Sequence, residues 1–591
     1  MEEGVSISPW SSLVESRFSD NALSRVARGL HLQTMDSELD SLMQAVFQAR
    51  RMRNKKAGPC TLPAEILAYI FECLQPYWPP LREHFDSEDA GFYSGWMSVT
   101  HVCSLWREVA LSTPSLWSKP TLDILNLPHQ YIPDILFRSQ LTLLELKLDW
   151  EGDFDFITKD GGLNAWLSPS ICRRARRLDI AADMDIVALV AARLPPSQDM
   201  AQLRELSVIV HGQDTLDLPV PFYNLSGLTS LSLHGCRAPW LSAVFSSHLT
   251  ALSLAYNRSE DRPSYSDIST LMALLHSLGT LHWEDIVPIS ESAGGNVPAI
   301  TFPKSLRQLT IHVTYEDLAL DALNFISHII TPSRCSRNYN IPSLSEQSTS
   351  DMALIDNALG RLLPDFSFAQ CDDIEERYLD LTISRVRVIG CPIASLQSAS
   401  PCAQLAQPKS TFVTNGLDIP AFSWGAPPLS LNDYLSLLAL EHLHSISLDV
   451  QTIRDLAKDN SWPCLLRSSG VHRIGVERPY MNSMYALLVK LLDALGTSYI
   501  RDPGDEPHIL FPQLEVLALP LFEDEVEHRD LVVSLISLVH ARREQRVPLR
   551  ELVVPLSAAS WSVWNTLRST VRVSFIHYPM FTSPMTPESV P

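Results

Sequence analysis

LPAEILAYIFECL, at residues 62–74, and WMSVTHVCSLWREVALSTPSLW, at residues 96–117, are the two segments that decide the fold of the N-terminal part of the chain. Pro63 suits the first turn of a helix, where its missing N–H group costs nothing. Apolar side chains then recur at steps of three and four residues, which places them on one helix face: Ile66, Leu67, Ile70, Phe71 and Leu74. The spacing predicts an amphipathic helix.

The second segment repeats this pattern and predicts a second helix. Its apolar positions are Trp96, Val99, Val102, Cys103, Trp106, Val109 and Ala110. Thr113-Pro114 ends the helix, because the residue before a proline is disfavoured in the α region. Leu116 and Trp117 are then free to fold back on the helix pair. A domain of ~50 residues buries little surface by itself. The helix pair is therefore expected to pack either against the rest of its chain or against a partner.

The identities of these residues closely resemble the F-box, and most closely the F-box proteins that mushroom-forming fungi carry in large numbers. The matching pattern is Leu62-Pro63-x-Glu65-Ile66-Leu67-x-x-Ile70-Phe71, then Val99-x-x-Val102-Cys103-x-x-Trp106-Arg107 and Thr113-Pro114-x-Leu116-Trp117. In that family the first helix and its leading Leu-Pro dock on the Skp-type adaptor of a cullin-RING ubiquitin ligase. Carried over by position, the resemblance implies adaptor contacts at Leu62, Pro63, Ile66, Leu67, Ile70, Phe71, Val99, Val102 and Trp106. It implies internal packing for Cys103 and Trp117.

The chain departs from the compact F-box between its two helices. The segment 75–95 is longer than the motif needs. It contains Pro76, Pro79 and Pro80 and then, among its acidic residues, Asp86, Glu88 and Asp89. This composition predicts a solvated loop. A loop that blocks or widens the adaptor surface is the alternative.

Composition excludes several classes of function. The chain has 591 residues and a formal net charge of −21, which disfavours non-specific binding to nucleic acid or to an anionic membrane. Its ten cysteines include no C-x-x-C pair, as is typical of free thiols in a reducing compartment. Neither a signal peptide nor an apolar run of ~20 residues occurs. We therefore expect the protein in the cytoplasm and/or the nucleus.

The N-terminal region is expected to contain one helix. Residues 1–34 are polar and predicted to be poorly ordered. Residues 35–57 predict an amphipathic helix, because apolar residues follow a heptad spacing over two heptads: Met35, Leu39, Leu42, Val46 and Ala49. A single surface helix leading into the predicted F-box at 60–120 is favoured over a coiled-coil dimer, because two heptads are few.

A repeated L-x-x-L-x-L pattern fills the chain after Trp117. It starts at Leu141 and recurs with central apolar residues 21 to 29 positions apart: Leu178, Leu206, Leu231, Leu252, Leu281 and Leu309. This period is the signature of leucine-rich repeats, in which each short strand stacks its inward side chains on those of the next repeat. We therefore predict an α/β fold, in which an irregular leucine-rich-repeat solenoid at 121–578 follows the helical F-box and precedes a disordered tail at 579–591.

The repeat becomes irregular beyond residue 313. The strand pattern returns with central residues Leu381, Ile446, Leu517 and Leu552, and a strand at 571–575 is expected to end the array. Helices are predicted at 240–245, 271–275, 485–496 and 531–541, and long loops at 331–351 and 389–429. Such loops in a solenoid are either binding elements or disordered.

No catalytic, cofactor or metal motif appears in the sequence. His442 and His444 lie two residues apart without a further ligand at metal-binding spacing, so solvent-facing side chains are favoured. The cluster Glu523, Asp524, Glu525 and Glu527 is predicted to be a solvated acidic face. An enzyme hidden in the irregular half, a hydrolase, is the weakest of the hypotheses.

The leading functional hypothesis is a non-enzymatic substrate-recognition subunit. The F-box would bind the Skp-type adaptor and through it a cullin, and the repeats would bind an unknown protein target. An interaction scaffold that joins no cullin complex is the alternative, and the long segment 75–95 is the feature that favours it.

Overall fold

A computed structural model describes most of the chain. The described residues are 9–18, 25–82, 92–119, 124–150, 161–212, 214–257, 262–289, 298–344, 349–367, 376–382, 385–391, 413–419, 431–458, 460–477, 485–500, 506–521, 525 and 528–576. The predicted tail at 579–591 therefore lies outside the described residues. The chain divides into two compact units, residues 1–179 with 193–195, and residues 180–192 with 196–591.

The first unit begins with two helices, where only one was expected. Helix α1 spans Pro9–Phe18 and α2 spans Arg25–Asn54, so α2 starts ten residues before the predicted helix at 35–57 and much of 1–34 is helical. Arg17 of α1 pairs with Glu38 of α2 at 3.2 Å. None of the helices among the described residues is both long and apolar enough to cross a bilayer.

The helical module of the first unit follows α2. It comprises the 3-10 turn η1 (Gly58–Thr61), α3 (Ala64–Leu74), the antiparallel pair β1 (Leu81–Arg82) and β2 (Phe92–Tyr93), η2 (Gly95–His101), α4 (Ser104–Ser112) and α5 (Ser115–Ser118). The single helix expected from 96 to 112 is two helices, because Cys103 is extended (φ −159°, ψ 170°) and caps α4. Val102 is consequently rotated out of the apolar stripe.

The first unit ends with short helices and two strands. These are η3 (Ile124–Asn126), η4 (His129–Tyr131), α6 (Ile132–Arg138), β3 (Leu144–Asp149), α8 (Gly161–Trp166), α9 (Pro169–Cys172) and β4 (Ala175–Ala182). The division between the units falls within β4. The sheet neighbours β3 and β4 begin the strand series that the repeat pattern predicts.

The second unit is built on one large sheet. Its strands are β5 (Glu205–Val210), β7 (Ser230–His234), β9 (Ala251–Ala255), β10 (Thr280–Glu284), β12 (Gln308–His312), β14 (Ser336–Asn340), β15 (Glu376–Leu381), β16 (Arg385–Cys391), β17 (Val413–Asp418), β18 (Ser445–Leu448), β19 (Arg473–Val476), β22 (Val516–Ala518), β23 (Glu551–Pro555) and β24 (Arg572–Ile576). They lie in the order β24-β23-β22-β19-β18-β15-β16-β17-β14-β12-β10-β9-β7-β5. Of the described pairings in this series, those of β16 with its two neighbours are antiparallel and the others parallel.

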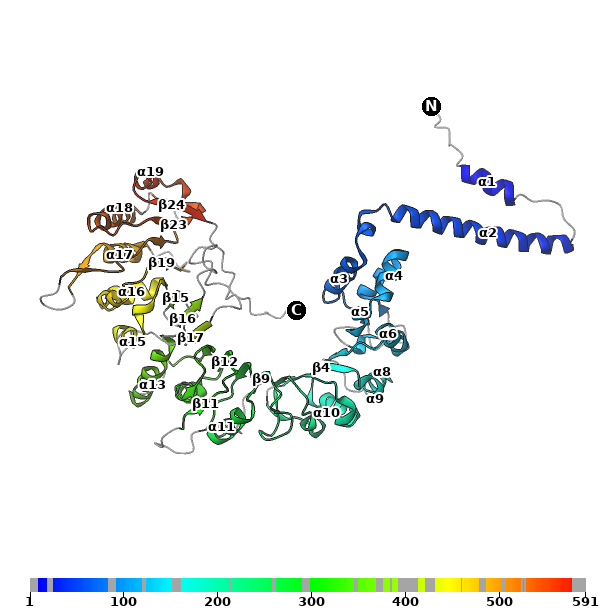
Figure 1. Cartoon of the computed structure of the whole chain (residues 1–591), viewed down its shortest axis with the longest axis horizontal. Coiled ribbons are helices and arrows are strands. Elements are labelled where there is room, and N and C mark those ends of the chain that lie inside the picture. The colour runs from blue at the N-terminus through cyan, green and yellow to red at the C-terminus, as the bar shows by residue number, and fades with distance from the viewer. Residues whose placement is uncertain are drawn as a thin grey trace, which may run out of the picture. The chain divides into compact units, whose positions relative to one another are not determined.

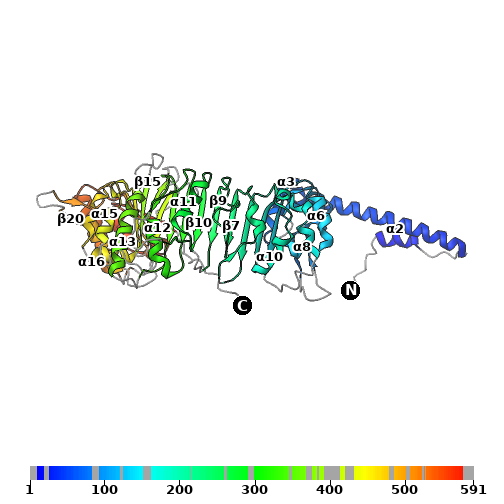
Figure 2. The same cartoon turned by 90° about the horizontal axis from the view of Figure 1, so that it is seen from below.

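Helices cover one face of this sheet, as Figure 1 shows for α11 to α19 and Figure 2 shows from a second side. The α-helices are α10 (Met184–Arg193), α11 (Tyr265–Leu274), α12 (Ala319–Ile326), α13 (Thr349–Leu362), α15 (Leu431–Leu437), α16 (Val450–Lys458), α17 (Tyr485–Gly496), α18 (Arg529–Glu544) and α19 (Val563–Leu567). Short 3-10 turns join them: η5 (Ser197–Met200), η6 (Val220–Asn224), η7 (Glu316–Leu318), η8 (Leu363–Ser367), η10 (Leu440–His442), η11 (Trp462–Arg467) and η13 (Leu556–Ser560). Three two-stranded pairs complete the unit: β6 (Leu216–Asp217) with β8 (Cys236–Arg237), β11 (Ile300–Thr301) with β13 (Ile329–Ile330), and β20 (Ser498–Tyr499) with β21 (His508–Ile509).

The central leucines of the predicted repeats lie directly opposite one another in the sheet. Leu206 pairs with Leu231, Leu231 with Leu252, Leu252 with Leu281, and Leu281 with Leu309. All five are buried, because alternate residues of each strand point toward the helices. The predicted fold class is therefore confirmed: an α/β solenoid follows a helical N-terminal module.

The irregular half holds more strands than predicted. Strand β14 lies within the loop expected at 331–351, and β16 and β17 contribute to the loop expected at 389–429, of which 392–412 and 420–429 lie outside the described residues. Strand β19 was not predicted. The central residue of β15 is Leu379 rather than Leu381, because Leu379 pairs with Ile446. The helix expected at 240–245 is a series of turns.

Several other expectations for this half are confirmed. Strand β24 stands at the end of the strand order, as predicted for 571–575. Helices α17 and α18 contain the predicted segments 485–496 and 531–541, and α11 contains all of the segment 271–275 except Leu275, which is its C-cap.

One buried cation joins the last repeats. Arg542 of α18 is fully buried and donates to the carbonyl oxygens of Leu495 and Leu510, both at 3.1 Å, and of Phe511 at 2.7 Å. Leu495 lies in the last turn of α17, where helix carbonyls lack partners within the helix. Burial lowers the pKa of Arg542 to about 10. The guanidinium therefore supplies donors to the carbonyls of Leu495 and Leu510, and a second donor to that of Phe511, which also accepts from the backbone N–H of Leu514 at 2.9 Å.

We expect Arg542→Met to lower the free energy of unfolding by about 3 kcal/mol, because it leaves buried acceptors without donors. Arg543→Met is the matched control, because Arg543 is the next residue of the same helix and is exposed. It should change stability by less than ~0.5 kcal/mol. Urea unfolding followed by circular dichroism measures both, and equal midpoints for the two variants would contradict this role.

Candidate functional site

The helical module has its own hydrophobic core. Helix α3 contributes Leu67 and Phe71 to it, and both are buried. The Phe71 ring lies 5.2 Å from the Trp106 ring of α4, measured between centroids, and Trp96 lies 5.1 Å from Trp117. The first contact fixes α3 against α4 and the second fixes η2 against α5, so one face of α3 is committed to internal packing.

Trp117 and Cys103 hold the ends of the helices. Trp117 is buried, as its predicted internal role requires, and its indole Nε1 donates to the carbonyl oxygen of Ala110 at 2.7 Å. Cys103 is half-buried, and its sulfur accepts a hydrogen bond from the backbone N–H of Trp106 at 3.5 Å. The Cys60 sulfur lies 3.8 Å away, and burial followed by the proximity of Cys103 raises the pKa of the Cys60 thiol. Cys103 thus caps α4.

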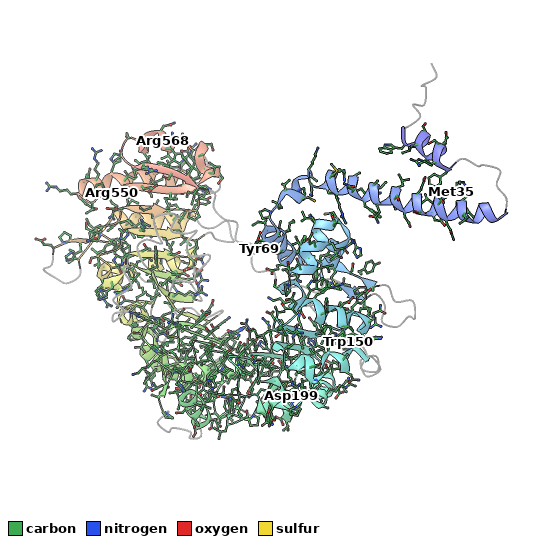
Figure 3. The ribbon with its side chains drawn as sticks, turned by 45° about the vertical axis from the view of Figure 1, so that its right-hand side comes forward. Met35, Tyr69, Trp150, Asp199, Arg550 and Arg568 are labelled. Atoms are coloured by element: carbon green, nitrogen blue, oxygen red, sulfur yellow. The ribbon has the colours of Figure 1, made fainter. Side chains whose placement is uncertain are left out.

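The opposite face of α3 is apolar and exposed. Ile66 and Ile70 lie on this face, while Leu62 and Pro63 precede α3 and Val102 follows η2. Leu62, Ile66, Ile70 and Val102 keep between 37 and 59% of their surface accessible, and Pro63 is exposed as well. Sequence analysis missed Tyr69, which is 65% exposed and labelled on α3 in Figure 3. Its position three residues after Ile66 was the available signal, because residues three apart share a helix face.

The structure separates the nine residues that the F-box resemblance marks as adaptor contacts. Five lie on the surface: Leu62, Pro63, Ile66, Ile70 and Val102. Leu67, Phe71 and Val99 are buried in the core, and Trp106 is half-buried against Phe71. The exposed five are available for direct contact with a partner, whereas the others hold them in place.

The described part of the segment 75–95 packs at the C-terminal end of α3. The Gln75 side chain donates to the carbonyl oxygen of Leu116 at 2.7 Å, and the backbone N–H of Trp96 donates to the carbonyl oxygen of Trp78 at 2.7 Å. Four apolar side chains of this segment are exposed: Tyr77, Trp78, Leu81 and Tyr93. The residues described here leave Ile66 and Ile70 exposed, so they do not block that face.

A second candidate surface lies on the face of the large sheet that points away from the helices. In register along it, Ser232 of β7, Ser253 of β9 and His282 of β10 form one row, and His234, Ala255, Glu284 and His312 form the next. The Glu284 carboxylate lies 3.9 Å from the His282 ring and 4.0 Å from the His312 ring. Burial lowers the pKa of His234 and His282, against the opposing effect of Glu284.

A cavity of about 400 Å³ opens at the C-terminal ends of these strands. Its lining includes His211, His234, Asn257, Glu284 and Asp285. The Asp285 carboxylate accepts from the backbone N–H of Thr314 at 2.7 Å and from its hydroxyl at 2.6 Å. Burial raises the pKa of Asp285, and the hydrogen bonds from Thr314 partly offset this effect. The cavity is polar and offers carboxylates to a bound group.

A cluster of charges lies further along the same sheet, in which Asp380 is buried and Arg385 and Glu477 are half-buried. Arg385 contacts Asp380 at 3.1 Å and Glu477 at 3.2 Å. Burial, and then the charge of Asp380, raises the pKa of Glu477 to about 7. Burial likewise raises the pKa of Asp380, against the attraction of Arg385 and Arg387. These groups are paired with one another, which indicates a structural role.

The described residues contain no group of three or more His, Cys, Asp and Glu side chains arranged to hold a metal ion. His442 is exposed, whereas His444 is half-buried and accepts from the backbone N–H of Arg377 at 3.2 Å. Of the predicted acidic face at 523–527, only Glu525 is described, and its carboxylate accepts from the backbone N–H of Val563 at 2.8 Å. His444 and Glu525 therefore have structural partners.

Comparison with known proteins supports the helical module. The family described as F-box-like matches residues 59–123. Comparison with curated proteins gave no match. Among solved structures, a leucine-rich-repeat protein of Leptospira interrogans aligns over 79% of this chain and 97% of its own, with 12% identity and a TM-score of 0.27. The N-terminal module is thus F-box-like, and the solenoid assignment comes from the strand topology itself.

Gly95 shapes the junction between the inserted segment and η2, and its replacement should destabilise the module. Its φ is +51°, and a Cβ atom there would lie 2.4 Å from the backbone of Pro79. We expect Gly95→Ala to lower the stability of the module by ~1–3 kcal/mol. Limited proteolysis of the purified chain reads this out as faster cleavage within residues 59–123. Gly58→Ala is the control, since no atom lies within 4 Å of its added Cβ, and equal cleavage rates would refute the prediction.

The Asp380–Glu477 cluster predicts a dependence of stability on pH. The folded pKa of Glu477, about 7, exceeds its ordinary value of 4.5. The stabilisation from its bound proton is therefore complete below pH ~4.5 and disappears as the pH rises through ~7. Glu477→Gln should flatten the decrease in melting temperature between pH 5 and 8, and Glu544→Gln, an exposed change on α18, should not. Parallel pH profiles for wild type and Glu477→Gln would contradict this assignment.

Proposed function

We propose that this protein is the substrate-recognition subunit of a Skp-cullin-F-box type ubiquitin ligase. The observation that carries the proposal is the exposed apolar face of α3 on a module that matches the F-box-like family. Contiguous exposed apolar side chains on a folded domain mark an interaction site. F-box domains generally bind Skp-type adaptors, and the fungal type of F-box protein remains a prediction from sequence.

The adaptor would contact the exposed residues directly. These are Leu62, Pro63, Ile66, Ile70 and Val102. Tyr69 joins them because it is exposed and lies three residues after Ile66, on the same side of the helix. Leu67, Phe71, Val99 and Trp106 contribute by holding α3 against η2 and α4. Burial of the exposed apolar groups against a complementary groove would supply the binding free energy.

The target protein would bind to the solenoid. Its sheet presents a row of short polar side chains with His282, Glu284 and the carboxylate-lined cavity beside them. The net charge of −21 favours a target with a basic surface. The protein would break no bond itself. It would raise the effective concentration of a target lysine near a charged conjugating enzyme, in the cytoplasm and/or the nucleus.

Adaptor capture tests this proposal. Wild-type chain should retain a recombinant Skp-type adaptor in a pull-down, and Pro63→Ala together with Ile66→Asp should reduce the affinity by about 100-fold, because a carboxylate would be buried in an apolar contact. Phe137→Asp on α6 is the control, because it places the same charge on another exposed apolar side chain of the same unit and should bind normally. Adaptor binding that survives the double substitution would refute the proposed surface.

A scaffold that binds the adaptor without a cullin is the second candidate. The exposed side chains Tyr77, Trp78, Leu81 and Tyr93 of the inserted segment favour it, because they would add bulk beside an adaptor seated on α3. Affinity purification from cells distinguishes the two functions. Recovery of adaptor and cullin together supports the ligase subunit, whereas adaptor without cullin supports the scaffold.

A further inference from the structure

Helix α2 carries an exposed stripe whose spacing is symmetrical. The stripe consists of Asp36, Leu39, Met43, Phe47 and Arg50, and all five side chains are exposed, the three apolar ones by 43 to 49%. The steps between them are three, four, four and three residues, so the pattern reads the same in both directions from Met43. At 3.6 residues per turn, the five positions fall within about 80° of the helix circumference.

The stripe differs from the heptad seam that the sequence predicts. Its neighbours on α2 at His31, Met35, Glu38 and Leu42 are half-buried, and Glu38 pairs with Arg17 of α1. This side of α2 includes two of the five predicted seam residues, Met35 and Leu42. In the adjacent stripe centred on Met43, by contrast, the large apolar side chains are exposed to solvent.

The charges at the two ends of the stripe are opposite. Asp36 and Arg50 are fourteen residues apart, which is about 21 Å along a helix, so they do not reach each other within one copy. Neither takes part in an ion pair among the described residues of the chain. A two-fold axis through Met43 would bring each Asp36 opposite the Arg50 of the second copy, and each Leu39 opposite its Phe47.

We propose that α2 forms an antiparallel homodimer with α2 of a second copy of this chain. An interface with two-fold symmetry uses the same patch twice and must be self-complementary, and the stripe meets this condition in spacing, in apolar character and in charge. A parallel pair would instead place Asp36 against Asp36 and Arg50 against Arg50, which repel. The occupant of this face is therefore a second copy rather than an unrelated protein.

Sedimentation equilibrium of the full chain tests the dimer. Wild-type chain should show a mass that rises from monomer to dimer with protein concentration. Met43→Glu places two carboxylates together at the axis and should weaken the dimer about tenfold or more. Met52→Glu is the matched control, because Met52 is 62% exposed on the opposite side of the same helix, and it should dimerise like wild type.

Charge exchange tests the antiparallel arrangement. Asp36→Arg and Arg50→Asp should each weaken the dimer, and the double variant should restore it, because the exchanged charges at positions 36 and 50 would again face each other across the axis. Circular dichroism should show unchanged helicity in every variant, since all the altered side chains are exposed. A wild-type chain that stays monomeric at all concentrations, or a double variant as weak as the singles, would overturn the proposal.

Discussion

The stacking of one row of inward side chains from strand to strand is the constraint on which the solenoid depends. The row runs through Leu206, Leu231, Leu252, Leu281 and Leu309 in direct register. Each parallel strand is short and buries little apolar surface alone, so each repeat is stable only against its neighbours. The same register fixes which side chains point to the opposite face, and so it places Ser232, Ser253 and His282 in a second row that is available to a partner.

The row continues through the irregular half, with a polar interruption. Leu309 pairs with Arg337, and Arg337 pairs with Asn415. Apolar residues resume in the next strands at Val388, Leu379 and Ile446. Arg337 donates to the side-chain oxygen of Asn415 at 2.8 Å and to the carbonyl oxygen of Asp365 at 2.5 Å. The core tolerates these polar groups because they satisfy one another. They accompany the antiparallel strand β16, which separates β15 from β17 and interrupts the parallel order.

The helical module follows a different rule from the solenoid. Helix α3 of this module has two apolar faces, and aromatic contacts decide which of them is internal. Phe71 packs against Trp106, while Ile66 and Ile70 remain in water. A pattern of apolar residues cannot distinguish these faces, since both consist of Ile, Leu and Phe at helical spacing. The F-box resemblance therefore marked nine residues as a single set, of which the structure exposes five.

The sequence by itself determined the helical module, the series of strands up to residue 313 and the inward position of each central leucine. These features are encoded by the local spacing of apolar residues and by the nearly constant length of the repeats. Tertiary structure decided what periodicity does not carry: the strand at 336–340, whose inward Arg337 and Tyr339 break the leucine pattern, and the two-residue shift to Leu379 in β15. It also decided the pairing of α1 with α2. These features depend on partners distant in the chain, and a buried polar residue is stable only where the fold supplies its hydrogen bonds.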